Sequence, residues 1–127
     1  MTKLRNGGFT LLELMVAMAI VAILSAIAIP FMESYRRRGY EASATQYLRS
    51  WVPAQELYLQ VNGFYADRDE DLAGAGIGVL QVPTDIPYEF SIDSGSKETE
   101  NWFGQADPRV GDLAHLSIDE SGIVVKR

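Results

Sequence analysis

Residues 9–31 read FTLLELMVAMAIVAILSAIAIPF, an apolar run in which only Thr10, Glu13 and Ser25 are polar. As a helix this run would be about 35 Å long, which is enough to cross the hydrocarbon core of a bilayer. The preceding segment 1–8, MTKLRNGG, is short and basic. The sequence therefore predicts a membrane-spanning helix whose basic preface lies in the cytoplasm by the positive-inside rule.

Two other kinds of segment share these features. A secretory signal peptide also begins with basic residues, but its apolar core spans about 7–15 residues and ends at a small-x-small site. Here the run is longer and is closed by residues 30–33, PFME. A generic membrane anchor leaves the carboxylate of Glu13 unexplained, because a charge near the centre of a membrane helix costs about 2.5–3.5 kcal/mol and less near an end. Glu13 is therefore a candidate functional residue.

A positive partner for Glu13 would arise if the chain were cut after Gly8, because the new amine of Phe9 would lie one helical turn away. In a stack of identical helices, that amine could instead meet Glu13 of a neighbouring copy. Glycine suits a cleavage site, since a backbone without a side chain can enter a protease groove closely.

The segment KLRNGGFTLLE, residues 3–13, resembles the class III signal of type IV pilins and pseudopilins. The resemblance covers about the first 35 residues. It implies that a prepilin peptidase cuts between Gly8 and Phe9 and methylates the new Phe9 amine, and that Glu13 guides each subunit into the filament. Pro30 falls where many family members carry a helix-kinking proline. Because proline removes a donor and clashes with the preceding turn, we expect a bend or local melting at residues 26–30.

Beyond residue 30, apolar or small side chains recur at alternating intervals of four and three residues, which is typical of one helical face. They are Tyr40, Ala44, Tyr47, Trp51, Ala54, Tyr58 and Val61. We expect one long helix from about Thr10 to Val61, bent at Pro53 and capped by Asn62-Gly63, whose aromatic stripe is buried against a sheet.

After residue 62 we expect a glycine-rich loop that contains a short helix at about 69–75. Beyond this loop, apolar and polar residues alternate as they do in half-buried β-strands. Strand candidates lie at 88–92, 102–103, 114–118 and 123–125. The expected fold is α+β, a long helix on an antiparallel sheet of three or four strands, which is similar to the pilin fold. The expected parts are a leader (1–8), a transmembrane or filament-core helix (9–31), an amphipathic helix half (32–62), a loop (63–84) and the sheet (85–127).

Composition restricts the chemistry and the partners. The chain has no cysteine and one histidine, His115, which excludes thiolate and multi-histidine metal sites within one subunit. Asp67, Asp69 and Asp71 imitate the start of a calcium loop, but Leu72 replaces the required glycine. We expect no metal, no cofactor and no catalytic residue. From residue 41 onward, six basic residues face fifteen acidic ones, which argues against nucleic acid as a partner.

The expected function is therefore structural rather than enzymatic. The resemblance implies a major or minor pilin that assembles with copies of itself and with other pilins, on an inner-membrane assembly platform. The precursor would be a single-pass protein of the bacterial inner membrane, and the product an extracellular pilus. Two alternatives stay open: a pseudopilin of a type II secretion system in a periplasmic pseudopilus, and a minor pilin that captures DNA for uptake.

Two further features leave questions open. Arg36, Arg37 and Arg38 lie just beyond the apolar run, where they could pair with acidic groups of adjacent subunits or form a solvated face. The family's usual C-terminal disulfide is impossible without cysteine, so the sequence does not say how the last strand is held.

Overall fold

The computed structural model of the chain describes residues 8–74, 81–93 and 101–127. Its helices are α1 (Leu11–Asn62) and α2 (Asp69–Gly74), and its strands are β1 (Tyr88–Asp93), β2 (Phe103–Pro108), β3 (Leu116–Asp119) and β4 (Val125–Lys126). The chain divides into two compact units. We call residues 1–36 the proximal unit and residues 37–127 the distal unit.

The proximal unit holds the first part of α1, and its described residues form no core. Every residue from Gly8 to Glu33 is exposed. Alanine, leucine and methionine recur along this stretch, and their high helix propensities favour the observed helix. The helix is unbroken through both Pro30 and Pro53, so the local melting considered for residues 26–30 does not occur. Because proline removes only one intrahelical hydrogen bond, the flanking turns keep the segment helical, and bends at the two prolines stay predictions.

The distal part of α1 buries most of the predicted stripe. Ala44, Tyr47, Trp51 and Ala54 are at most 2% exposed. Tyr40 and Tyr58 pack against the edge of the same core. Val61, the last residue of the predicted face, is 74% exposed, because the core residues of α1 end one turn earlier. The stripe also omitted Leu48 and Gln55, both fully buried.

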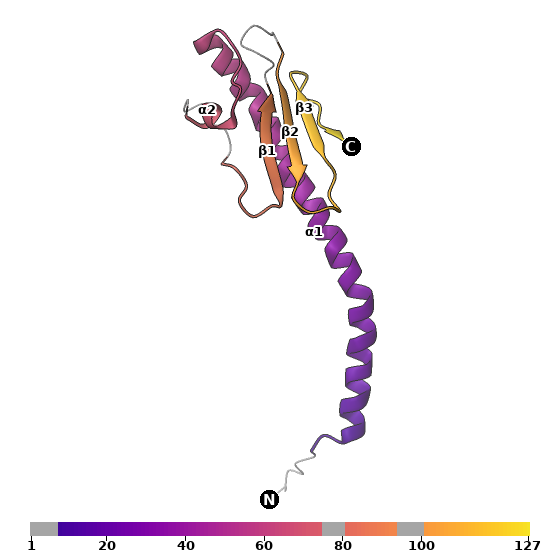
Figure 1. Cartoon of the computed structure of the whole chain (residues 1–127). Coiled ribbons are helices and arrows are strands. Elements are labelled where there is room, and N and C mark those ends of the chain that lie inside the picture. Colours follow the sequence, from indigo (N-terminus) through magenta and orange to yellow (C-terminus); the bar gives the residue numbers. More distant parts are fainter. Residues whose placement is uncertain (1–7, 75–80, 94–100) are drawn as a thin grey trace, which may run out of the picture. The chain divides into compact units, whose positions relative to one another are not determined.

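The four strands form one antiparallel sheet in the order β1-β2-β3-β4, which confirms the predicted α+β fold (Figure 1). The second half of α1 covers one face of this sheet. The residues facing the helix alternate along each strand, as the pleat requires. They are Tyr88, Phe90 and Ile92 of β1, Gly104 and Ala106 of β2, and Leu116 and Ile118 of β3.

Small residues in β2 make room for the indole of Trp51. A Cβ built on Gly104 would lie 2.8 Å from two carbons of that ring and 2.9 Å from Ile118. The rings of Tyr47 and Phe90 complete an edge-to-face cluster with Trp51, with centroid separations of 4.6–6.2 Å. Helix and sheet therefore interlock around one aromatic side chain.

The end of α1 and the following loop are held by paired backbone groups. Gly63 adopts a positive φ of 81°, and its N–H donates to Leu59 O at 2.8 Å, which confirms the predicted cap. Further on, Gln55 Nε2 donates to Ala66 O at 2.9 Å while Ala66 N–H donates to Gln55 Oε1 at 2.8 Å. One buried amide thus fixes the chain just before α2.

Candidate functional site

The peptide bond between Gly8 and Phe9 lies in an exposed segment directly before α1. Residues 8–10 belong to no helix or strand, and Phe9 is 90% exposed. A Cβ built on Gly8 would meet no atom within 4 Å. The bond that the sequence predicts as the cleavage site is therefore open to approach by another protein.

Thr10 and Glu13 form a reciprocal capping box at the start of α1. Thr10 N–H and Thr10 Oγ1 both donate to Glu13 Oε2 at 3.0 Å, and Glu13 N–H donates to Thr10 Oγ1 at 3.2 Å. This arrangement satisfies backbone donors that the first turn of a helix leaves unpaired. The capping box was not among the predicted features, although Thr-x-x-Glu before an apolar run is its usual signature.

The capping box also sets the direction of the Glu13 carboxylate. Both bonds from Thr10 end on Oε2, so the carboxylate is turned back toward Phe9. Among the described residues, no bond is made by Oε1 and no cation lies within ion-pairing distance of it. At the head of an apolar helix, the structure therefore holds a carboxylate in a fixed direction, and one of its oxygens is unbonded within residues 8–74, 81–93 and 101–127.

That helix carries an apolar stretch near its N-terminus that is long enough, by length and composition, to cross a membrane. None of this stretch is buried inside the structure. Pro30 lies near its distal end and is exposed like its neighbours.

The distal unit secures its last strand without a disulfide. Arg127 N–H donates to His115 O at 2.9 Å, and His115 N–H donates to Arg127 O at 3.1 Å. Lys126 Nζ lies 2.5 Å from Oε2 of Glu41, whose side chain is only 19% exposed. An ion pair to α1 and a pair of backbone bonds thus hold β4, which answers the question that the missing cysteines left open.

Glu41 also affects the adjacent strand. Burial and then the charge of Glu41 raise the pKa of Tyr88. The Tyr88 hydroxyl donates to Ala114 O at 2.9 Å. Glu41 of α1 thus pairs with Lys126 of β4 and is part of the distal scaffold.

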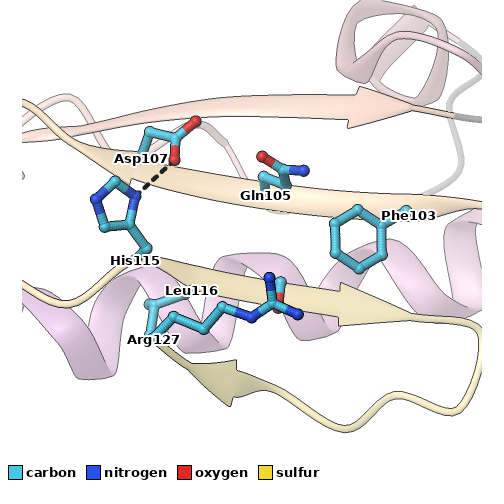
Figure 2. Close-up of a pocket in the computed structure, with 7 residues that line it drawn as sticks. Phe103, Gln105, Asp107, His115, Leu116 and Arg127 are labelled. Atoms are coloured by element: carbon cyan, nitrogen blue, oxygen red, sulfur yellow. Dashed lines mark hydrogen bonds and ion pairs between the residues drawn. The ribbon is translucent and has the colours of Figure 1, made fainter.

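A hollow of about 310 Å³ lies on the outer face of the sheet (Figure 2). His115 Nδ1 lies 2.9 Å from Asp107 Oδ1 there, and both side chains are more than half exposed, so the contact adds little stability. Within the described residues no hydroxyl is hydrogen-bonded to His115, and a histidine–aspartate pair activates a nucleophile only when one is. The described residues also contain no group of three or more acidic or histidine side chains that could hold a metal ion.

Comparison with known proteins identifies the family. Residues 3–29 match a family model described as a prokaryotic N-terminal methylation motif. The type IV wide pilus major component PilA4 of Thermus thermophilus is 37% identical over 94 residues, which cover 73% of this chain and 69% of that protein. The chain belongs to the type IV pilin family.

Other relatives include both branches that the sequence left open. The type IV major pilin protein PilA of Myxococcus xanthus is 40% identical over 63 residues, which span 50% of this pilin but 29% of the relative. The type II secretion system core protein G of Aeromonas hydrophila is 29% identical over 95 residues, which span 75% of this pilin and 64% of the relative. The residues that match the methylation motif, 3–29, include Gly8, Phe9 and Glu13.

Proposed function

We propose that this pilin is a structural subunit of a type IV pilus, made as a membrane-anchored precursor and cut between Gly8 and Phe9. One observation carries the proposal: Thr10 turns the Glu13 carboxylate toward the cleavage site, and Oε1 has no partner among the residues that the structure describes. Relatives described as major components of type IV pili support the pilus over the pseudopilus, because the secretion relative is less similar.

Cleavage by a prepilin peptidase would change the charge at this position. Hydrolysis of the Gly8–Phe9 bond releases a carboxylate on Gly8 and an ammonium group on Phe9, and N-methylation of that amine keeps its positive charge. The capping box does not use the amide of Phe9, so it can persist after cleavage. The mature chain would then carry a cation and a carboxylate one turn apart.

Between copies, the same two groups would form the assembly contact. Oε2 of Glu13 is already occupied by Thr10, whereas Oε1 can accept from the Phe9 ammonium of a neighbouring subunit. Stacking the exposed apolar helices would lower the local dielectric constant, which strengthens the attraction and makes an unpaired Glu13 costly. A subunit would therefore dock only where its amine meets a free carboxylate.

The proposed route begins in the inner membrane, where the apolar stretch of α1 would hold the precursor until an assembly platform extracts it. In the filament, neighbouring helices would replace lipid around side chains such as Phe9 and Leu11, which are 90% and 78% exposed. The partners are thus other pilins and the assembly machinery.

Replacement of Glu13 tests the docking contact. We expect Glu13→Ala to insert into the membrane as well as the wild type or better, since it removes a charge from the apolar stretch, but to give few or no filaments. The measurement is the amount of subunit in sheared filaments relative to the membrane fraction. Glu33→Ala is the matched control, because Glu33 is an exposed acid on the same helix outside the apolar run. Normal filaments from Glu13→Ala would contradict the proposal.

Replacement of Gly8 tests the cleavage site separately. A side chain at this position would obstruct the protease groove, so we expect Gly8→Asp to accumulate as uncut precursor in the membrane. Intact-mass spectrometry distinguishes the precursor from a mature chain that begins at N-methylated Phe9. Mature-length protein in this strain would refute the proposed cut.

A further inference from the structure

The distal unit has a groove between the exposed face of α1 and β4, with a cavity volume of about 500 Å³. Its charged walls are Arg38, Glu41, Arg49 and Lys126, and Ala42 and Thr45 lie between them. The helical members recur every three or four residues, so they share one face of α1.

The groove is basic although the chain is acidic. Lys126 neutralises Glu41, so the two arginines keep their full charge. Both arginines are exposed, and neither has an acidic partner among the described residues. They are three helical turns apart, a separation of about 16 Å at 1.5 Å per residue. Because the two charges are so far apart, an acidic segment of several residues matches the groove better than a single small anion. The chain itself has a net charge of −6, so it can supply acidic residues.

An acidic segment of this kind lies at the opposite edge of the same sheet. Residues 67–71, DRDED, carry four carboxylates and one guanidinium. Buried Ala66 and Leu72 anchor the two ends of this segment, and Asp67 and Glu70 are exposed. α2 contacts β1, whereas the groove adjoins β4, and β1 and β4 are the two outer strands (Figure 1). The basic and acidic surfaces therefore cannot meet within one chain.

We propose that this groove binds the acidic segment 67–71 of a second copy of the chain. A contact between two different surfaces of identical subunits does not close on itself, so it can repeat along a helical filament. Charges at such a rim set orientation and association rate more than affinity, and they would align distal units around the Phe9–Glu13 contact. The inference rests on the proposed function, because it needs the subunits to polymerise.

Cysteine crosslinking tests the contact, because the chain has no cysteine of its own. The full chain carrying Arg49→Cys and Glu70→Cys is expressed with its assembly machinery, and sheared filaments are oxidised. We expect a ladder of disulfide-linked multimers. The control pair Arg109→Cys and Glu70→Cys should stay monomeric, because Arg109 is an exposed arginine outside the groove.

Charge reversal gives an independent readout. We expect Arg38→Glu with Arg49→Glu to reduce filament yield about tenfold, and added Asp67→Arg with Glu70→Arg to restore most of it. Asp69 is left unchanged because it caps α2 through the N–H of Glu70. The quadruple variant separates lost contact from lost folding, since only a restored contact rescues assembly.

The outcomes distinguish this inference from the proposed function. Wild-type filaments that start at Phe9, with no ladder and no rescue, would overturn the inference and leave the proposed function standing. Absence of wild-type filaments would instead count against the proposed function. If the Arg38→Glu, Arg49→Glu variant assembles normally but its precursor loses binding to vesicles of anionic phospholipid, the groove recognises lipid headgroups and the inference is wrong.

Discussion

Every large apolar side chain of α1 before Arg36 is at least 51% exposed, whereas Tyr47, Leu48 and Trp51 of the same helix are at most 2% exposed. Hydrophobic composition alone does not distinguish the two stretches. The distal stretch faces a sheet made by the same chain, and the proximal stretch has no partner in the described part of the chain.

This difference separates folding from assembly. Burial of apolar surface stabilises a structure only where the partner surface is present. The distal unit contains both surfaces and should fold as a unit. In the proposed route, the proximal unit depends first on lipid and then, in the filament, on other subunits. Substitutions in the distal unit should therefore change the free energy of unfolding, and substitutions in the proximal unit should change assembly.

The largest folding effect is expected at Gly104. Because an added Cβ would lie 2.8 Å from the Trp51 ring, Gly104→Ala should force the helix and the sheet apart and cost about 1–3 kcal/mol of unfolding free energy. Urea unfolding of the detergent-solubilised chain, followed by fluorescence of the buried Trp51 and Trp102, measures the change.

Gly111→Ala is the matched control for this substitution. No atom lies within 4 Å of its built Cβ, so its unfolding free energy should change by less than about 0.5 kcal/mol. Equal destabilisation by the two alanines would show that the sheet does not pack closely on Trp51.

A smaller effect is expected at Gln55. Gln55→Ala would remove both hydrogen bonds from the buried N–H and C=O of Ala66, and because water can enter the space left by the shorter side chain, we expect a net loss of about 1 kcal/mol. Gln60→Ala, an exposed glutamine on the same helix, should be nearly neutral. The same urea titration compares them. A neutral Gln55→Ala would mean that the loop before α2 does not depend on this amide.

The smallest effect is expected at the turn that leads back to the last strand. Hydrogen bonds from Ser121 lower the pKa of Asp119. A carboxyl group whose pKa is lowered by folding adds stability above its unfolded pKa and loses it as the pH falls through the folded pKa. Ser121→Ala should therefore raise the pKa of Asp119, and the small stability difference should vanish in acid.

Titration of Asp119 by NMR between pH 2 and pH 6 covers this window. Ser91→Ala, an exposed serine on β1, should leave the Asp119 titration unchanged. An unchanged pKa of Asp119 in Ser121→Ala would show that the turn does not hold the carboxylate.

Helical periodicity and strand alternation predicted helix and strand positions, because both patterns depend only on residues that are close together in the sequence. Helical periodicity located the buried face from Ala44 to Ala54, and alternation located β1 at Tyr88–Asp93. The N-terminal motif indicated the family, since Gly8, Phe9 and Glu13 lie close together in the sequence. The family match confirms that interpretation, and the roles of the three residues stay predictions.

Contacts between distant residues could not be predicted in the same way. Gln55 looks like an ordinary polar helix residue until Ala66 comes to lie beside it, and Gly104 looks like a weak strand residue until Trp51 is placed against it. The pair of Glu41 and Lys126 joins positions 85 residues apart. Such contacts depend on register and packing, which one sequence does not specify. The capping box is different, because the local pattern Thr10-x-x-Glu13 is enough to predict it from the sequence.

The most direct test of the proposed assembly is a high-resolution structure of filaments sheared from cells, combined with mass spectrometry of their subunits. We expect subunits that begin at N-methylated Phe9, with each Phe9 nitrogen within about 4 Å of Glu13 Oε1 in a neighbour, at ion-pair distance. Filaments in which Glu13 contacts only its own Thr10, or whose subunits keep residues 1–8, would contradict it.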